Sequence, residues 1–116
     1  MYGIPNCGTC KNAKKWLESH GHKVELADLK MSSPSETTLL TLIQQSGLDV
    51  DRFFNTSGEV YKTLSLKDKI KSMSLDEKLH ILSSNGMLMK RPVVTDGKTT
   101  TVGFKEETYQ SVWGSH

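Results

Sequence analysis

The chain of 116 residues has few cysteines and prolines, and it has no large excess of charge of one sign. Fifteen basic residues nearly balance thirteen acidic ones, so the net charge of +2 does not favour binding to nucleic acid or to a membrane surface. No apolar stretch is long enough to cross a membrane, and no segment resembles a signal peptide. Two cysteines are too few for a disulfide framework or for a zinc site of about four ligands. We therefore expect a cytoplasmic protein without a bound metal or cofactor.

The length and composition predict a single domain over residues 1–113. Hydrophobic residues make up 35% of the chain and charged residues 24%, which is typical of a soluble globular protein. The pattern along the chain divides this domain into a core, at residues 1–31 and 87–113, and a helical insertion at residues 32–86. The last three residues, 114–116, follow the final apolar residue, and we expect a tail or a cloning remnant there.

Both cysteines lie in the segment IPNCGTCK at residues 4–11. A short apolar run precedes it and an apolar pattern of helical spacing follows it, so Cys7 is expected in a strand-to-helix turn. The free N–H groups at a helix N-terminus stabilise an anion, and Lys11 adds positive charge nearby. A thiol in that position ionises more easily, and the thiolate is the reactive form. The spacing predicts a redox-active dithiol in which Cys7 attacks and Cys10 resolves.

Other interpretations of the cysteine pair are weaker. A disulfide across a two-residue spacer closes too short a loop to stabilise the fold much. His20 and His22 have the wrong spacing to complete a zinc site. Two buried cysteines without a chemical role remain an alternative.

The remaining elements are predicted from local signals. A strand is expected over Val24–Leu29, and a capping box with proline at the first helical position is expected to start a helix at Ser33. Gly47 ends that helix. Two further helices start near residues 65 and 74, and the second is expected to bury one apolar face (Leu75, Leu79 and Leu82).

Strands return near the C-terminus. A hairpin is expected over residues 92–102 around Asp96-Gly97, followed by a helix that carries Tyr109, Val112 and Trp113 on one face. The order is strand, helix, strand, helical block, hairpin and helix. It predicts an α/β protein with a small mixed sheet, flanking helices and a helical insertion between the second and third strands.

This order, with a Cys-x-x-Cys motif at the first strand–helix turn and a proline before the third strand, resembles the thioredoxin-like fold. The resemblance implies that the bond before Pro92 is cis and that Pro92 lies close to Cys7. Only about 5–6% of X-Pro bonds in folded proteins are cis, so this is a specific expectation.

Five short motifs extend the resemblance to the arsenate reductase/Spx family. They are YGI-x-NC-x-T at residues 2–9, WLE at 16–18, FNTSG at 54–58, KRP at 90–92 and VGF at 102–104. Together they span almost the whole chain.

The resemblance implies that Cys7 is the nucleophile, since arsenate reductases of this family attack arsenate with a cysteine at this position. They hold the oxyanion with three arginines. Arg91 matches one of them, whereas the second falls on or next to Asn55 and the third falls near Gly103, with only Lys105 nearby. Asparagine or a displaced lysine does not replace the planar guanidinium fork of arginine, which argues against arsenate as the substrate.

The chain is most similar to a branch of small, uncharacterised reductase-like proteins of the family. The resemblance implies thiol–disulfide exchange with glutathione as a candidate co-substrate, and glutaredoxin or another thiol protein as a partner. Together with the spacing of the cysteines, it leads us to assign Cys7, Cys10 and Arg91 to catalysis, and Asn55, Pro92 and Lys11 to substrate binding. Spx-type regulators, which bind the α subunit of RNA polymerase and use the dithiol as a redox switch, are the alternative. They carry a basic helical extension after the last helix of the fold, which this chain is not expected to have.

Overall fold

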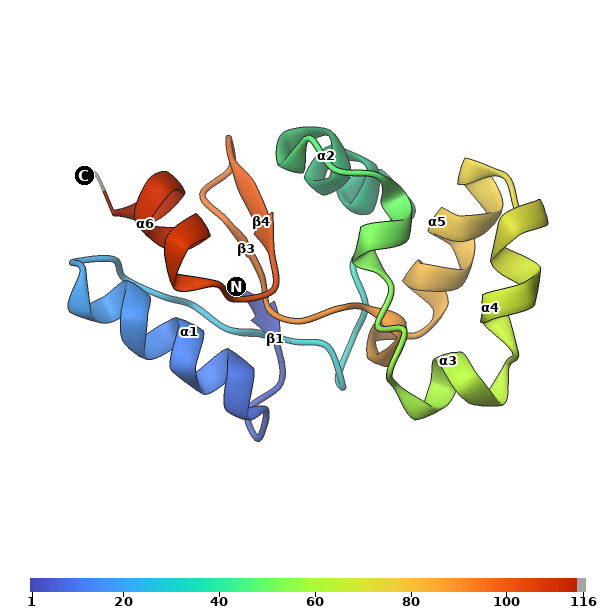
Figure 1. Cartoon of the computed structure of the whole chain (residues 1–116), viewed down its shortest axis with the longest axis horizontal. Helices are drawn as coiled ribbons and strands as arrows, with labels where there is room; N and C mark the ends of the chain where they lie inside the picture. The colour runs from blue at the N-terminus through green and yellow to red at the C-terminus, as the bar shows by residue number, and fades with distance from the viewer. Residues whose placement is uncertain (115–116) are drawn as a thin grey trace.

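The computed structural model describes residues 1–114, so Ser115 and His116 of the expected tail lie outside the described residues. Figure 1 shows a sheet with two helices beside it and a helical block at its other end. In chain order the elements are β1 (Tyr2–Gly3), α1 (Gly8–Ser19), β2 (Ala27–Asp28), α2 (Glu36–Ser46), the 3-10 helix η1 (Val50–Phe53), α3 (Glu59–Thr63), α4 (Leu66–Lys69), the 3-10 helix η2 (Ile70–Ser72), α5 (Leu75–Ser84), the 3-10 helix η3 (Gly86–Leu88), β3 (Val93–Thr95), β4 (Thr100–Val102) and α6 (Glu106–Trp113).

Within residues 1–114 the strands form a four-stranded mixed sheet in the order β2-β1-β3-β4. β1 and β2 are parallel, with Tyr2 opposite Ala27, as expected for a strand–helix–strand unit. β3 is antiparallel to both β1 and β4, and the β3–β4 hairpin turns at Asp96-Gly97 as predicted. The arrangement confirms the predicted thioredoxin-like fold.

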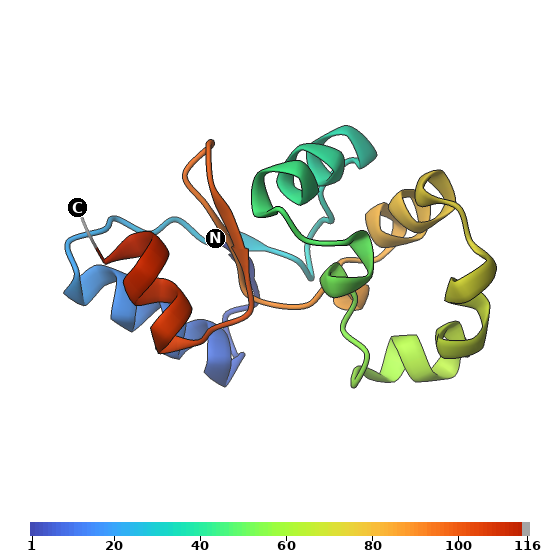
Figure 2. The same ribbon diagram turned by 45° about the horizontal axis from the view of Figure 1, so that its top comes forward.

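The two faces of the sheet bury two different cores, because successive side chains of a strand point to opposite faces. Val93 packs into a large core with α2, α5 and the segments between them. Val94 packs on the other face with Tyr109 and Trp113 of α6 and with residues of α1. Figure 2 shows α1 and α6 together on one side of the hairpin and α2 on the other. β4 is therefore an edge strand between α6 and α2.

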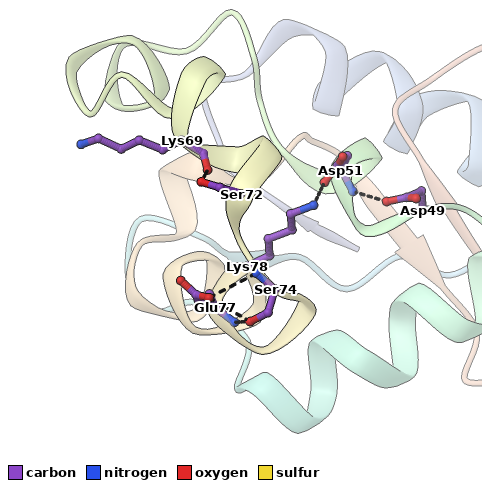
Figure 3. A network of polar contacts seen from close by, with 7 residues as sticks. All are labelled: Asp49, Asp51, Lys69, Ser72, Ser74, Glu77 and Lys78. Carbon is purple, nitrogen blue, oxygen red and sulfur yellow. Dashed lines mark hydrogen bonds and ion pairs between the residues drawn. The ribbon is translucent and has the colours of Figure 1, made fainter.

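Polar contacts connect elements within the helical block (Figure 3). Lys78 of α5 reaches across to η1, where its Nζ lies 2.7 Å from Oδ1 of Asp51. Ser74 and Glu77 form a complete capping box at the start of α5, as the sequence predicts. Gly47 adopts the left-handed conformation with φ 69° at the end of α2, which is also as predicted.

Several local predictions are wrong in detail. The second strand is confined to Ala27–Asp28, because only these residues pair with β1. α2 starts two residues later than expected: its N-cap is Ser35, whose Oγ accepts a hydrogen bond from the Thr38 N–H. Ser33 instead donates its hydroxyl to the Leu82 carbonyl, 2.7 Å away, so Pro34 precedes the helix rather than opening it.

The block at residues 59–72 also departs from expectation. α3 was not predicted, and Ser65 before α4 is left-handed, with φ 53° and no side-chain capping bond. Leu75 is 46% exposed, so the buried face of α5 is formed by Leu79 and Leu82 without it. No helix within residues 1–114 is long and apolar enough to cross a membrane. The division into a core and an insertion stays a prediction.

Candidate active site

Cys7 lies at the N-cap of α1, at the carboxyl end of β1. Its backbone is extended, with φ −89° and ψ 120°, and its Sγ accepts a hydrogen bond of 3.3 Å from the Cys10 N–H. A sulfur atom thus occupies the position in which Ser, Thr or Asp usually caps a helix. No acidic residue lies in the first turn of α1, so the positive end of the helix dipole is not neutralised there.

The two thiols lie in different environments. Cys7 is partly exposed, whereas Cys10 is only 1% exposed. Cys10 packs against β1 at Gly3, where an added Cβ would lie 2.9 Å from its Sγ. Glycine at this position therefore makes room for the inner sulfur. Both cysteines are free thiols in this structure.

The pKa values of the two thiols also differ: that of the partly exposed Cys7 is lowered and that of the buried Cys10 is raised. Partial burial tends to raise the pKa of Cys7, but hydrogen bonds from the Cys10 thiol and N–H, together with the Arg91 guanidinium, lower it below its ordinary value. Burial, followed by the hydrogen bond that the Cys10 thiol donates to Cys7, raises the pKa of Cys10 to about 11. At neutral pH the outer sulfur is thus the easier one to ionise, and the inner one keeps its proton.

Arg91 reaches the same site from the segment that leads into β3. The Arg91–Pro92 peptide bond is cis, as the resemblance implied. Nη1 of Arg91 is buried and has no hydrogen-bond partner among the described residues. A buried guanidinium nitrogen without a partner is costly, and an anionic ligand would satisfy it.

Cys7 and Arg91 line one cleft of about 700 Å³, which runs along the β4 edge of the sheet. Asn55 also lines it. Pro92 is almost fully buried, and Lys11 is exposed on the first turn of α1; neither residue forms part of the cleft wall.

Asn55 reaches the cleft through a pairing between segments far apart in sequence. Phe54 and Met89 form an antiparallel bridge. On either side of it, the Asn55 N–H donates to the Leu88 carbonyl at 2.7 Å and the Lys90 N–H donates to the Phe53 carbonyl at 2.8 Å. The loop after η1 is therefore fixed beside the segment that carries Arg91.

Further residues of the cleft were not singled out as site residues from the sequence. Arg52 and Lys90 line it together with Lys105, so that four cations including Arg91 surround it, and no Asp or Glu among residues 1–114 does so. The only local signal for Lys90 was its position directly before Arg91. A second cavity, of about 490 Å³, lies beside Met1 and Trp113, and neither cysteine lines it.

Comparisons with known proteins agree with this architecture. The sequence model of the ArsC family matches residues 2–112. YusI of Bacillus subtilis strain 168, an uncharacterised protein, is 50% identical over 113 residues, which cover 97% of this chain and 96% of YusI. The global transcriptional regulator Spx 2 of Lactococcus lactis subsp. lactis strain IL1403 is 30% identical over 107 residues, covering 92% of this chain and 80% of the regulator. The solution NMR structure of SACOL0876 from Staphylococcus aureus COL is similar with a TM-score of 0.89 at 41% identity, covering 98% of this chain and 97% of that one.

Proposed function

The chain belongs to the ArsC family, and on that premise we propose that it is a thiol–disulfide oxidoreductase with Cys7 as its nucleophile. The observation that carries this proposal is the contrast between the two thiols. Cys7 faces a cleft and has a lowered pKa, whereas Cys10 is buried beside it with a raised one. Such a pair suits a two-step exchange, in which the first sulfur attacks the substrate and the second, still protonated, resolves the mixed disulfide afterwards.

In the first step the Cys7 thiolate attacks one sulfur of a disulfide substrate. A bond forms between Cys7 and that sulfur, and the other half of the substrate leaves as a thiolate that takes a proton from water. In the second step Cys10 loses its proton and attacks Cys7. The substrate thiol leaves, and the protein holds a Cys7–Cys10 disulfide that an external thiol must reduce again.

Arg91 supports the first step by stabilising the thiolate before attack. Its charge and hydrogen bonding lower the pKa of Cys7, together with the Cys10 N–H at the start of α1. Glutathione is the external thiol that we propose, with glutaredoxin or another thiol protein as the partner. Arsenate is not the substrate that we propose, because only Arg91 stands at one of the three arginine positions that the resemblance implies for an oxyanion site.

The test is the rate at which the reduced protein reacts with a small neutral disulfide, measured against pH. The rate of the wild-type protein is expected to show a pKa for Cys7 below 9.0, the ordinary value for a cysteine thiol, and Arg91→Ala is expected to move this pKa upward. Cys7→Ser is expected to abolish the reaction, and Cys10→Ser to accumulate the mixed disulfide. A wild-type inflection at the free-thiol value would contradict the proposal.

A regulatory role is the second candidate, and the 30% identity to Spx 2 favours it. In that case the dithiol would act as a switch, and the α subunit of RNA polymerase would be the partner. Retention of that subunit by the immobilised reduced protein, but not by the oxidised protein, would support this role. If the subunit is not retained in either state, the regulatory candidate is wrong.

A further inference from the structure

We propose that Arg52, Lys90 and Lys105 form a second anion-binding subsite in the cleft, and that the substrate is a small disulfide carrying carboxylates. This inference rests on the proposed exchange at Cys7 and adds the class of substrate. Cys7 and Arg91 would hold the reacting sulfur, and the three other cations would hold carboxylates farther along the cleft.

The turn at Gly103 lies beside Lys90 and leads to Lys105, and both lysines line the cleft. Gly103 has φ 80°, and its N–H donates to the Pro92 carbonyl at 2.8 Å. The side chain of Lys90 extends over this turn, since a Cβ built on Gly103 would lie 3.5 Å from Cε of Lys90. Lys105 follows two residues later, at the N-cap of α6.

Arg52 is linked to Lys90 through the backbone of η1. It belongs to η1, and its neighbour Phe53 accepts the hydrogen bond from the Lys90 N–H. The backbone pairing that fixes Asn55 therefore also fixes Arg52 relative to Lys90. Arg52, Lys90 and Lys105 thus line one cleft from three segments that are separate in the sequence.

These cations are not neutralised by the protein itself. Within residues 1–114 none of the three forms an ion pair with a carboxylate, and no acidic side chain lines the cleft. By contrast, Lys78 outside the cleft is paired with Asp51. A cleft lined by unpaired positive charge attracts anions and raises their local concentration.

The size of the cleft selects a small molecule as the occupant. Its volume of about 700 Å³ lies within the range of roughly 300–1,000 Å³ that is typical of small-molecule sites. The buried Nη1 of Arg91 offers one anion contact beside the sulfur, and the second subsite offers others. The exchange itself is unchanged: the Cys7–substrate bond forms as the disulfide breaks, and one substrate thiolate leaves.

The experiment compares three disulfides of similar size that differ in charge: dianionic 3,3′-dithiodipropionate, neutral bis(2-hydroxyethyl) disulfide and dicationic cystamine. Rates of the reduced full chain are normalised to those of a small neutral thiol, which removes the intrinsic reactivity of each disulfide. The dianion is expected to react fastest and the dication slowest, and the difference should shrink as salt is added.

Lys90→Gln and Lys105→Gln are each expected to lower the dianion-to-neutral rate ratio by roughly two- to fivefold, the range set by exposed ion pairs. Lys71→Gln is the matched control, since this exposed lysine of η2 lies outside the cleft and should leave the ratio unchanged. A preference for the dianion that persists in both cleft variants would overturn the second subsite, because Arg91 alone would then explain it.

The two proposals fail in different ways. If the wild-type protein reacts with the neutral disulfide no faster than a free thiol does at the same pH, the exchange activity is wrong. If the neutral reaction is fast but the three disulfides show no order by charge, the exchange stands and the second subsite is wrong.

Discussion

Gly3 is predicted to be the residue that allows the buried sulfur of the dithiol to pack, and Gly3→Ala tests this directly. The new Cβ would lie 2.9 Å from the Sγ of Cys10 and 3.4 Å from both its Cβ and Cδ1 of Leu26. The first distance is shorter than a relaxed carbon–sulfur contact. Because Cys10 is 1% exposed and packed on all sides, its sulfur has little space into which it can move.

The expected change follows from two opposing effects. Forcing an extra methyl into a packed core destabilises a protein by about 1–3 kcal/mol. Replacing glycine by alanine also restricts the unfolded chain, which stabilises by roughly 0.4–1 kcal/mol where the backbone allows it. We therefore expect Gly3→Ala to lower the free energy of unfolding by about 1–2 kcal/mol.

The assay is urea unfolding of the reduced protein, followed by tryptophan fluorescence, in a double-mutant cycle with Cys10→Ala. Removing the sulfur removes the atom that the new methyl meets, so Gly3→Ala is expected to become nearly neutral in the Cys10→Ala background. The coupling between neighbouring core positions is typically about 0.5–3 kcal/mol. Gly8→Ala is the matched control, because a Cβ at Gly8 meets no atom within 4 Å and alanine suits the start of α1.

Two outcomes would refute the reasoning. One is a Gly3→Ala variant as stable as wild type, which would mean that the inner sulfur moves without cost. The other is an equal loss with and without the Cys10 sulfur, which would place the effect in the strand β1 rather than in its contact with the dithiol.

Two further predictions concern groups buried near the site. The raised pKa of Cys10 means that the folded state holds this proton more tightly than the unfolded state, so its contribution to stability is complete below pH 9.0 and is lost as the pH rises toward about 11. Urea unfolding in steps from pH 8 to about 11 should show this fall in the free energy of unfolding, and Cys10→Ala should make the fall smaller. The lowered pKa of Cys7 makes stability rise with pH instead, but only below pH 9.0. Tyr109→Phe removes the hydroxyl that donates to the Gly103 carbonyl at 2.9 Å, which should cost about 1–2 kcal/mol in the same assay. A Tyr109→Phe variant as stable as wild type would mean that this carbonyl finds another donor.

The parts of the fold that the sequence predicted well are those decided by neighbours in the chain. The α1 start at Cys7, the capping box at Ser74, the end of α2 at Gly47 and the turn at Asp96 each depend on a few adjacent residues. In each case the local signal satisfies the backbone N–H or carbonyl groups that a helix end or a turn leaves open.

The predictions that failed depended on partners distant in sequence. Ser33 has the chemistry of an N-cap, but the Leu82 carbonyl accepts its hydroxyl, and Ser35 takes the cap instead. The alternation at residues 24–29 suggests a longer strand, yet only Ala27 and Asp28 find a partner in β1. Leu75 fits the apolar period of α5 but lies at its first residue, where it remains 46% exposed.

In the candidate site, too, the residues set by local sequence were predicted and those set by distant pairing were not. The Cys-x-x-Cys spacing and the helix that follows it could be interpreted locally, and they favour Cys7 as the reactive thiol. Nothing local indicates that Arg52 and Asn55 flank the same cleft as Lys90 and Arg91, because the bridge between Phe54 and Met89 brings them together across more than thirty residues. Family motifs assigned Asn55 and Arg91 to the site, whereas Lys90 stood in the KRP motif without a role and Arg52 stood in no motif.

The reactive thiol and the cations of the cleft come from different parts of the chain. The reactive sulfur lies between β1 and α1, which follow one another in the chain, whereas the cations that line the cleft come from η1, from the segment before β3 and from the N-cap of α6. By the resemblance to arsenate reductases, Asn55 and Gly103 lie where two of the three oxyanion-binding arginines were expected. The unpaired charge of the cleft comes instead from Arg52, Lys90 and Lys105. Under the proposed function, the N-terminus of α1 would stabilise the attacking thiolate together with Arg91, while the other cations of the cleft would favour an anionic substrate without contributing to the attacking sulfur.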